Sequence, residues 1–460
     1  MRTPAPNVRP VGLTIAGSDS GGGAGIQADL ATMAAHGVFG TSAITAVTAQ
    51  HTRGVESSHV LPLEEIRAQI DAVTGDFDVG AAKTGMLATT EIVQTVADYA
   101  REFDFPLVVD PVMVATSGDR LLEPEAERAY EDLLGAATLA TPNADEVEVL
   151  TDVTVTDEAT AREAGEAILE TGVDAVLVKG GHVPGERVRD TLVTSETVRT
   201  FEHPRVDTDA THGSGCTLAA AITARLAAGE HLESAVEGAI DFLAHAIRYH
   251  YDVGEGPGAV NHFVDLRDDA SREPTAEAVQ AVVDRLVDAD VSALVPEVGM
   301  NVVGATPSAE SVADAAAVEG RITRTLSGIN PNRGVRFGTS SSVAPILLAA
   351  RESHPTLRFA ANCRFDADVE AALDSLERDV LEVDAGAVDD IASGSSLETP
   401  STDDGTEPRT TVSSLADREV PPAALLDRGD VGREATVTVL ATDPETLAER
   451  LLALDSEVDR

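Results

Sequence analysis

The sequence predicts an α/β protein with two domains. Short apolar runs of strand length alternate with amphipathic helical segments through the first half of the chain, and polar residues follow several of these runs directly. Alternation of this kind indicates a largely parallel central sheet covered by helices on both faces. The composition turns polar at 267–274, which we expect to be a linker between a domain at 1–266 and a smaller α/β domain at 275–460.

The expected elements follow in chain order. A buried strand at 11–17 leads into a glycine-rich turn at 17–25 and a helix that ends at Gly37, with Ile26, Leu30 and Met33 on one face. Further strands are expected at 41–48, 79–83, 107–110, 138–141, 175–179 and 190–193, and helices at 64–73, 91–102, 125–134, 159–171 and 217–228.

In the second domain, Thr275 is expected to cap an amphipathic helix. A strand is predicted at 434–440 and a helix at 444–452. Before this strand, 388–418 is rich in Ser, Thr, Asp and Gly without apolar periodicity, which predicts a flexible insertion inside the second domain.

Polar side chains gather where apolar runs end. Gln50, Lys83, Asp110, Asn143 and Lys179 each follow such a run. Because the carboxyl ends of parallel strands meet at one edge of a sheet, these residues predict a ligand site there.

The stretch THGSGC at 211–216 precedes a breaker-free run of helix formers. The amides of Gly213 to Cys216 should therefore point out of a helix N-terminus, where an anion such as phosphate binds. An ordinary small-residue turn before a buried helix is the alternative. Gly23-x-Gly25-x-x-Ala28 also fits a dinucleotide fingerprint, but weakly, because the next strand ends at Gln50 without an acid for a ribose.

Charge and composition exclude several classes. The formal charge is 33 − 79 = −46, which opposes a nucleic-acid partner. Lysine occurs only at Lys83 and Lys179, and an acidic, lysine-poor chain suits a salt-saturated cytoplasm, so we expect a halophilic source and stability that falls when KCl is removed. Cys216 and Cys363 are too few for a disulfide framework, and no 18-residue apolar span occurs. We expect a cytoplasmic homo-oligomer that binds no membrane.

Seven motifs together carry a family resemblance: AGSDSGGGAGIQADL (16–30), TAVTAQ (45–50), KTGML (83–87), DPVM (110–113), TPNADE (141–146), VKGGH (178–182) and THGSGC (211–216). In this order they closely resemble the hydroxymethylpyrimidine/phosphomethylpyrimidine kinases of thiamine biosynthesis, within the ribokinase-like superfamily. The resemblance implies a three-layer α/β/α domain that uses ATP to phosphorylate 4-amino-5-hydroxymethyl-2-methylpyrimidine and then its monophosphate. A pyridoxal-type kinase is the rival.

For phosphoryl transfer, the resemblance assigns ATP binding to Lys179 and Thr211, and Mg²⁺ to Asp110 and Glu146. Glu146 has an alternative as a first-turn helix acid.

The same resemblance places Cys216 at the general-base position, where many ribokinase-like enzymes carry Asp. A helix N-terminus should lower its pKa, although a buried inert thiol is the alternative. The amides of Gly213, Ser214 and Gly215 would hold the transferred phosphoryl group.

For the substrate, the Gln50 amide complements the ring nitrogen and exocyclic amine of an aminopyrimidine, and Asp29 adds a second polar contact. Gly17, Met86 and Val112 would form the surrounding wall, although core packing explains Met86 and Val112 nearly as well.

Residues 275–460 resemble an archaeal-type thiamine-phosphate synthase domain. The resemblance rests on EVGMN (297–301), EGRI (319–322), GVRFGTSSS (334–342) and DRGDVGRE (427–434). Arg321 and Arg336 are candidates for pyrophosphate, and Ser340 and Ser341 for a phosphate cradle. Ser342 stands where the family has histidine, so two hypotheses remain: a synthase acting on thiazole phosphate, or a non-catalytic module that binds thiamine phosphate or a precursor.

Overall fold

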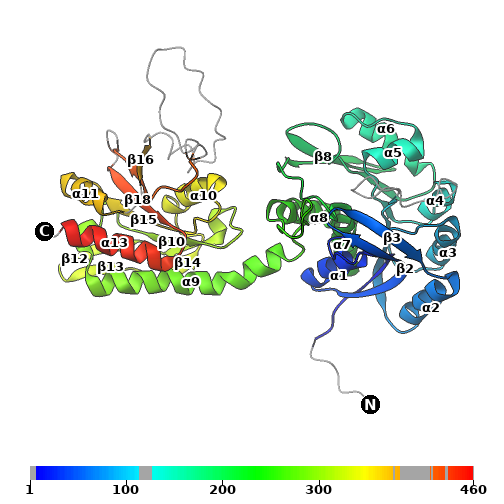
Figure 1. Ribbon diagram of the computed structural model, residues 1–460, viewed down its shortest axis with the longest axis horizontal. Helices are drawn as coiled ribbons and strands as arrows, with labels where there is room; N and C mark the ends of the chain where they lie inside the picture. Colours follow the sequence, from blue (N-terminus) through cyan, green and yellow to red (C-terminus); the bar gives the residue numbers. More distant parts are fainter. Residues whose placement is uncertain are drawn as a thin grey trace, which may run out of the picture. The chain divides into compact units, whose positions relative to one another are not determined.

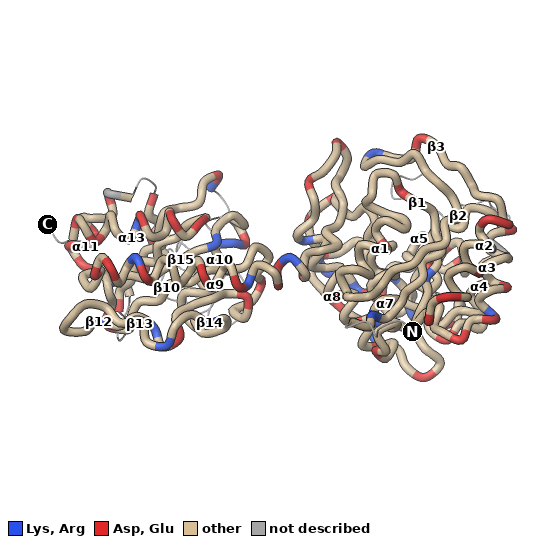
Figure 2. The backbone as a smooth tube through the Cα atoms, turned by 90° about the horizontal axis from the view of Figure 1, so that it is seen from below, with Lys and Arg blue, Asp and Glu red and all other residues tan. Residues whose placement is uncertain are grey.

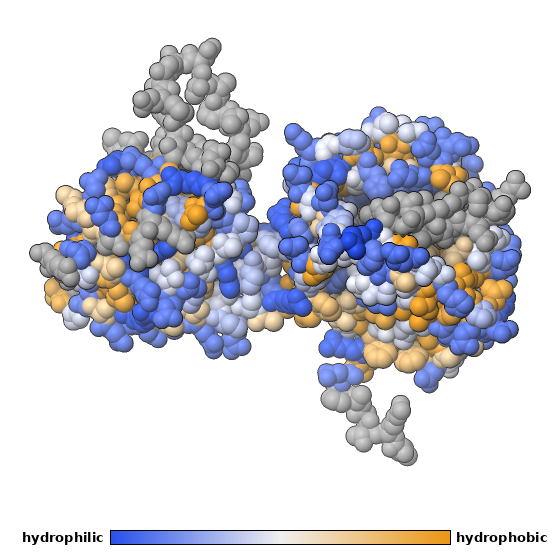
Figure 3. Space-filling view, in the orientation of Figure 1, coloured by the Kyte–Doolittle hydropathy of each residue, from blue (hydrophilic) through white to orange (hydrophobic). Residues whose placement is uncertain are grey.

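The computed structural model describes residues 7–112, 127–376, 379–383, 415, 418–429, 432 and 434–458. The chain divides into two compact units, Met1–Asp265 and Leu266–Arg460. None of the described helices combines the length and the apolarity needed to cross a membrane. Aspartate and glutamate residues are spread over many elements of both units (Figure 2), and hydrophilic residues cover much of the visible surface (Figure 3).

The first unit is built on a nine-stranded sheet in the order β3-β2-β1-β4-β5-β6-β7-β8-β9. The neighbouring strands in the central run β2-β1-β4-β5-β6-β7 all pair in parallel. The pairs β2–β3, β7–β8 and β8–β9 at the two edges are antiparallel. The largely parallel sheet is therefore confirmed. Its strands are β1 (Val11–Ser18), β2 (Phe39–His51), β3 (Gly54–Val60), β4 (Val79–Thr84), β5 (Leu107–Val109), β6 (Leu139–Ala140), β7 (Ala175–Val178), β8 (Arg187–Thr194) and β9 (Val198–Pro204).

Helices cover both faces of this sheet (Figure 1). They are α1 (Gly25–Ala35), α2 (Leu63–Thr74), α3 (Thr90–Ala100), α4 (Glu127–Leu134), α5 (Ala144–Thr151), α6 (Glu158–Leu169), α7 (Ser214–Ala227) and α8 (Leu232–Arg248).

The two faces follow from the alternation of side chains along a strand. On β5, Val109 packs with Ile66 of α2 and Val93 of α3 in one core, while Val108 packs with Leu218 of α7 and Val236 of α8 in the other. All three residues of β5 are buried, which explains why the central strands read as unbroken apolar runs.

The second unit has a seven-stranded sheet in the order β14-β11-β10-β15-β18-β17-β16 and a β12–β13 hairpin. It is α/β, but all its pairs are antiparallel except β16–β17. The strands are β10 (Val302–Ala305), β11 (Ala315–Val318), β12 (Ile322–Thr325), β13 (Gly328–Pro331), β14 (Val335–Phe337), β15 (Phe359–Arg364), β16 (Val380–Val383), β17 (Ala424–Asp427) and β18 (Thr436–Ala441).

Helices α9 (Val264–Ala289), α11 (Ala367–Ala372) and α13 (Pro444–Val458) contribute to one core of this unit. Helix α10 (Val343–Ser353) contributes to the other. Of the insertion expected at 388–418, only residues 415 and 418 lie within the described part of the chain.

Residues 267–274, expected to be a linker, lie inside α9, and Thr275 is therefore not a helix cap. The reason is that polar residues of this stretch have partners in the second unit. Asp268 accepts hydrogen bonds from the amide and hydroxyl of Ser308, and the guanidinium of Arg272 lies 4.0 Å from the centre of the Phe337 ring.

Candidate active site

A pocket of about 560 Å³ opens in the first unit beside the start of α7. Asp110 and Lys179, which follow β5 and β7, line it, and so does Gln50 from the end of β2. Its lining includes residues of the glycine-rich turn and Gln50. It also includes a set of apolar side chains: Val188, Val206, Leu218, Leu243, Ala244 and Ile247.

The start of α7 requires glycine. Gly213 has a positive φ of 80°, and a Cβ there would lie 1.8 Å from the carbonyl oxygen of Gly23. The Ser214 amide donates to the Thr211 carbonyl at 3.0 Å, so it is already engaged. The Gly215 and Cys216 amides lie in the first helical turn, which offers no intrahelical acceptor. The residues Thr211, Gly213, Ser214, Gly215 and Cys216 all line the pocket, and Gly215 and Cys216 are its best-placed anion donors.

The thiol of Cys216 is partly buried at the pocket wall. Desolvation raises its pKa to about 11, although nearby Lys83 and a hydrogen bond from the Gly25 amide act in the opposite direction. The expectation that the helix N-terminus lowers this pKa is therefore wrong. Removal from water outweighs the favourable field, and the thiol is protonated at neutral pH.

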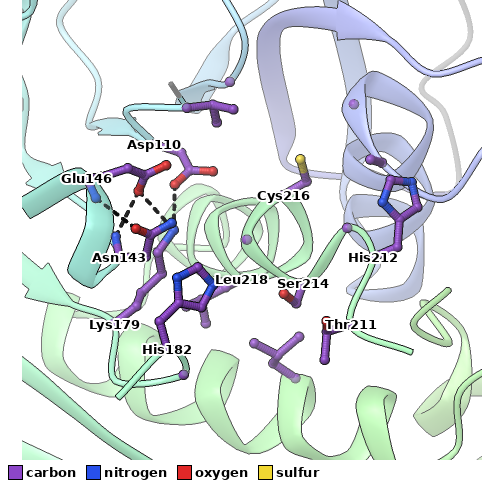
Figure 4. Close-up of a pocket in the computed structure, with 18 of the residues that line it drawn as sticks. Asp110, Asn143, Glu146, Lys179, His182, Thr211, His212, Ser214, Cys216 and Leu218 are labelled. Carbon is purple, nitrogen blue, oxygen red and sulfur yellow. Dashed lines mark hydrogen bonds and ion pairs between the residues drawn. The ribbon is translucent and has the colours of Figure 1, made fainter. Parts of the chain in front are cut away.

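Lys179 joins the two carboxylates predicted to bind metal (Figure 4). Its Nζ lies 2.9 Å from Oδ1 of Asp110 and 3.8 Å from Oε2 of Glu146. The Thr141 hydroxyl also donates to Asp110, at 3.1 Å. Although burial acts against the charged amine, the two carboxylates hold the pKa of Lys179 above its usual value. The cluster is thus a nearly dry, negatively charged corner that one ammonium partly neutralises.

Glu146 also has a structural role. Asn143 caps α5, accepting from the Glu146 amide at 2.9 Å, while Oε2 of Glu146 accepts from the Asn143 amide at 2.8 Å. Burial raises the pKa of Glu146 to about 7, and Lys179 offsets part of the effect. This capping box fixes the carboxylate beside Asp110.

Among the described residues, no three His, Cys, Asp or Glu side chains lie close enough together to hold a metal ion. Within the described residues, the candidate metal ligands are therefore two carboxylates, those of Asp110 and Glu146, without a third side chain of these types beside them.

Four of the five residues predicted to surround the pyrimidine line the pocket. They are Gln50, Gly17, Met86 and Val112. A Cβ on Gly17 would lie 2.4 Å from Cε of Met86, so the close packing of this wall depends on glycine. The Thr48 hydroxyl donates to the Ser18 carbonyl at 2.7 Å, and the same oxygen lies 3.3 Å from Oε1 of Gln50.

Asp29 does not line the pocket. It is fully buried, and its carboxylate accepts from the Thr14 hydroxyl at 2.6 Å and from Nζ of Lys83 at 2.9 Å. Lys83 is also fully buried, and the Asp29 carboxylate raises its pKa even though burial acts the other way. The structure therefore keeps this pair behind the pocket wall.

Sequence reasoning missed Asp19 and His212, which both line the pocket. Oδ2 of Asp19 lies 3.2 Å from Nε2 of His212. Burial alone would raise the pKa of Asp19, but the His212 hydrogen bond and then the amides of Gly21 and Ala24 lower it below its usual value. The only sequence signal was an Asp at the head of a glycine-rich turn.

In the second unit, three of the four candidates have protein partners. The Arg321 guanidinium donates to the Val298 carbonyl, and Nε of Arg336 lies 2.8 Å from Glu319. The buried Ser340 hydroxyl accepts from the Val343 and Ala344 amides at the start of α10. Ser341 is exposed.

Comparison with known proteins adds two family matches. Residues 19–261 match the family model described as Phosphomethylpyrimidine kinase, and residues 278–453 match that described as Thiamine-phosphate synthase ThiN. A hydroxymethylpyrimidine/phosphomethylpyrimidine kinase of Haemophilus influenzae is 47% identical over 267 residues, which cover 57% of this chain and 99% of that protein. The Bacillus subtilis protein of the same name is 44% identical over 258 residues, covering 55% and 95%.

Solved structures of related proteins cover a little more than half of the chain. The ADP complex of Bacillus subtilis pyridoxal kinase is 34% identical with a TM-score of 0.53, covering 56% of this chain and 99% of that one. Staphylococcus aureus pyridoxal kinase in complex with AMP-PCP and pyridoxal is 30% identical with a TM-score of 0.53, covering 57% and 96%.

Proposed function

The chain belongs to the phosphomethylpyrimidine kinase family, and we propose that its first unit transfers the γ-phosphoryl group of ATP to hydroxymethylpyrimidine and then to the resulting monophosphate. The observation that carries this proposal is the position of α7. Its first-turn residues Gly215 and Cys216 line the same pocket as Gln50 and the cluster of Asp110, Glu146 and Lys179, and a Cβ on Gly215 would lie 3.4 Å from Nζ of Lys179. A ring alcohol bound at Gln50 and a nucleotide phosphate bound at the cluster would thus share one pocket with the start of α7.

The pocket chemistry suits this division. The apolar residues of the pocket lining suit an adenine ring, while the Gln50 amide can donate to and accept from an aminopyrimidine edge. The Gly215 and Cys216 amides would stabilise charge on the transferred group. Thr211 would contribute through its carbonyl, which orients the loop before α7.

Asp110 and Glu146 fit Mg²⁺. This ion is commonly held by one or two carboxylates together with substrate phosphates and water, so the pair needs no third protein ligand. When bound there, it would neutralise charge on the nucleotide phosphates. Lys179 would act beside it as a point charge, holding both carboxylates in place and reaching toward a phosphate.

We place Cys216 next to the reacting hydroxyl in its neutral form. With a pKa of about 11, the thiol is a hydrogen-bonding group at neutral pH and not an ionised base. Phosphoryl transfer with a loose transition state depends mainly on positioning, because the attacking oxygen gains little charge early. Orientation of the hydroxyl is therefore the contribution that a neutral thiol can make.

The test is product analysis. The purified chain is incubated with ATP, Mg²⁺ and hydroxymethylpyrimidine at high KCl, and the pyrimidine products are resolved by mass spectrometry. We expect the monophosphate first and the diphosphate later. A failure to form either one under conditions where the protein is folded contradicts the proposal.

Pyridoxal is the second candidate substrate, because solved relatives at 30–34% identity are pyridoxal kinases. Relatives at 44–47% identity that carry the pyrimidine kinase name favour the pyrimidine. The same assay with pyridoxal in place of hydroxymethylpyrimidine measures how fast the protein phosphorylates this second candidate.

For the second unit we propose a non-catalytic module that binds thiamine phosphate or a precursor. Ser342, at the N-terminus of α10, cannot supply the proton transfer or charge of an imidazole, and the Ser340 hydroxyl is engaged by helix amides. Calorimetric titration of the full chain with thiamine phosphate should show binding. A synthase assay with the pyrimidine diphosphate and thiazole phosphate should show no thiamine phosphate; product formation would instead establish the bifunctional alternative.

A further inference from the structure

Two glycine-rich segments, 19–25 and 211–216, touch at the pocket although almost 200 residues separate them. The carboxylate of Asp19 organises the first of them. Its Oδ1 accepts from the Gly21 amide at 2.7 Å, and its Oδ2 accepts from the amides of Gly23 at 3.1 Å and Ala24 at 2.8 Å. Because Asp19 is only 2% exposed, this carboxylate works almost entirely within the turn.

His212 brings the second segment to the same carboxylate. Its Nε2 lies 3.2 Å from Oδ2 of Asp19, and only a protonated Nε2 can donate to a carboxylate. The imidazole also packs closely on the turn, since a Cβ on Gly23 would lie 2.7 Å from Cδ2 of His212. Thus a polar and a steric contact join the same two segments.

The glycine-rich turn lies against the start of the helix that carries the thiol. A Cβ on Gly213 would lie 1.8 Å from the Gly23 carbonyl oxygen, and Cys216 is in the first turn of α7. Gly25 has a positive φ of 56°, and a Cβ there would lie 2.5 Å from the Gly17 carbonyl oxygen, so the backbone of the turn has little freedom to shift locally. The position of the turn against α7 therefore depends on how the two segments are held together. Figure 4 shows Cys216 between His212 and the cluster of Asp110, Glu146 and Lys179.

We propose that Asp19 and His212 are positioning residues that form a clasp, holding the glycine-rich turn against the start of α7 and so setting the position and exposure of Cys216 in the first turn of that helix. The clasp controls how much water reaches the thiol and where Sγ sits relative to a substrate hydroxyl. Its effect on catalysis rests on the proposed kinase function, but its effect on the thiol does not.

Thiol labelling tests the clasp without any turnover. The chain has two cysteines, and Cys363 is fully buried in the second unit, so iodoacetamide in a Cys363→Ala background reports on Cys216. His212→Ala should raise the labelling rate about tenfold, because a lost charge-assisted hydrogen bond increases local opening by that order. His212→Gln, whose side-chain amide can still donate to Asp19, should stay within about twofold of the parent.

Two further variants sharpen the test. His59→Ala removes an exposed histidine on β3 and should leave labelling unchanged. Gly23→Ala keeps both members of the clasp but places a methyl group against the imidazole, so it should label as fast as His212→Ala. If His212→Ala does not fold, which circular dichroism shows, Asp19→Asn replaces it, because the carboxamide oxygen still accepts from the turn while the charge is lost.

Turnover gives a second readout. Opening the clasp should lower kcat for the pyrimidine about tenfold or more with KM changed less than about threefold, and His212→Gln should recover most of kcat. Equal labelling of the His212→Ala and His59→Ala proteins would overturn the clasp. Faster labelling without any kinase activity in the parent would keep the clasp and reject the proposed function.

Discussion

The ammonium nitrogen of Lys179 lies 2.9 Å from Oδ1 of Asp110 and 3.8 Å from Oε2 of Glu146, so one cation serves two buried carboxylates. Lys179 is one of only two lysines in the chain. The other, Lys83, is likewise paired with a buried carboxylate, that of Asp29. In a protein whose remaining basic residues are arginine or histidine, both ammonium groups lie inside the first unit next to the pocket.

The Lys179→Met substitution should lower both the stability of the protein and its turnover. Two buried carboxylates would face each other without their cation, which should lower the free energy of unfolding by about 3 kcal/mol, and turnover should fall about a hundredfold or more. Lys179→Arg keeps the charge and should retain most of the stability. Chemical denaturation and steady-state kinetics of the two variants check this. Parent-like turnover of Lys179→Met at saturating ATP would remove Lys179 from the transfer step.

Glu146→Gln should change how stability depends on pH. Since folding raises the pKa of Glu146 from its ordinary value near 4.5 to about 7, its favourable contribution is complete below about 4.5 and is lost as pH rises through about 7. The parent should therefore lose stability relative to Glu146→Gln between pH 5 and 8, by about 1–3 kcal/mol.

Melting of both proteins across this range, at constant KCl, measures that difference. A constant difference in melting temperature from pH 5 to 8 would mean that Glu146 does not titrate in this window.

The Cys216→Ser and Cys216→Ala variants should differ in turnover. If the neutral thiol orients the substrate hydroxyl, serine preserves a hydrogen bond and should keep turnover within about tenfold of the parent, whereas alanine should lose about a hundredfold. KM for the pyrimidine should change little in either. An ionised thiol acting as base predicts equal damage in both variants, together with parental kcat that rises about tenfold per pH unit between 7 and 9.

Gln50→Ala should weaken substrate binding. Loss of a polar recognition group costs about 1–3 kcal/mol, so KM for the pyrimidine should rise about tenfold to a hundredfold while kcat is nearly preserved. Gln280→Ala, on α9 in the second unit, is the matched control and should match the parent. A fall in kcat without a change in KM would indicate that Gln50 acts in the transfer step and not in recognition.

Sequence patterns predicted the parts of the site that lie on regular elements. Asp110 and Lys179 were found because unbroken apolar strands end beside them, and the candidate anion donors because a glycine-rich stretch leads into a helix. Asp19 and His212 could not be paired in this way, since their contact joins segments far apart in the chain. The same limit applies to Asp29, whose polarity suggested a ligand contact but whose partners are Thr14 and Lys83.

The pKa of Cys216 shows a second limit. The helix N-terminus was visible in the sequence, but the depth of the thiol in the pocket wall was not, and desolvation decides the direction of the shift. Likewise, polarity at 267–274 suggested a linker because Asp268 and Arg272 look solvent-exposed in sequence, whereas both contact the second unit.

The most direct test of the central claim is the ratio of kcat/KM for hydroxymethylpyrimidine to that for pyridoxal, measured with ATP and Mg²⁺ on the full chain at high KCl. The account predicts a ratio of at least about a hundred, and a fall in that ratio in the Gln50→Ala protein because the amide recognises the aminopyrimidine edge. A ratio near or below one, or no phosphorylation of the pyrimidine by folded protein, would contradict it.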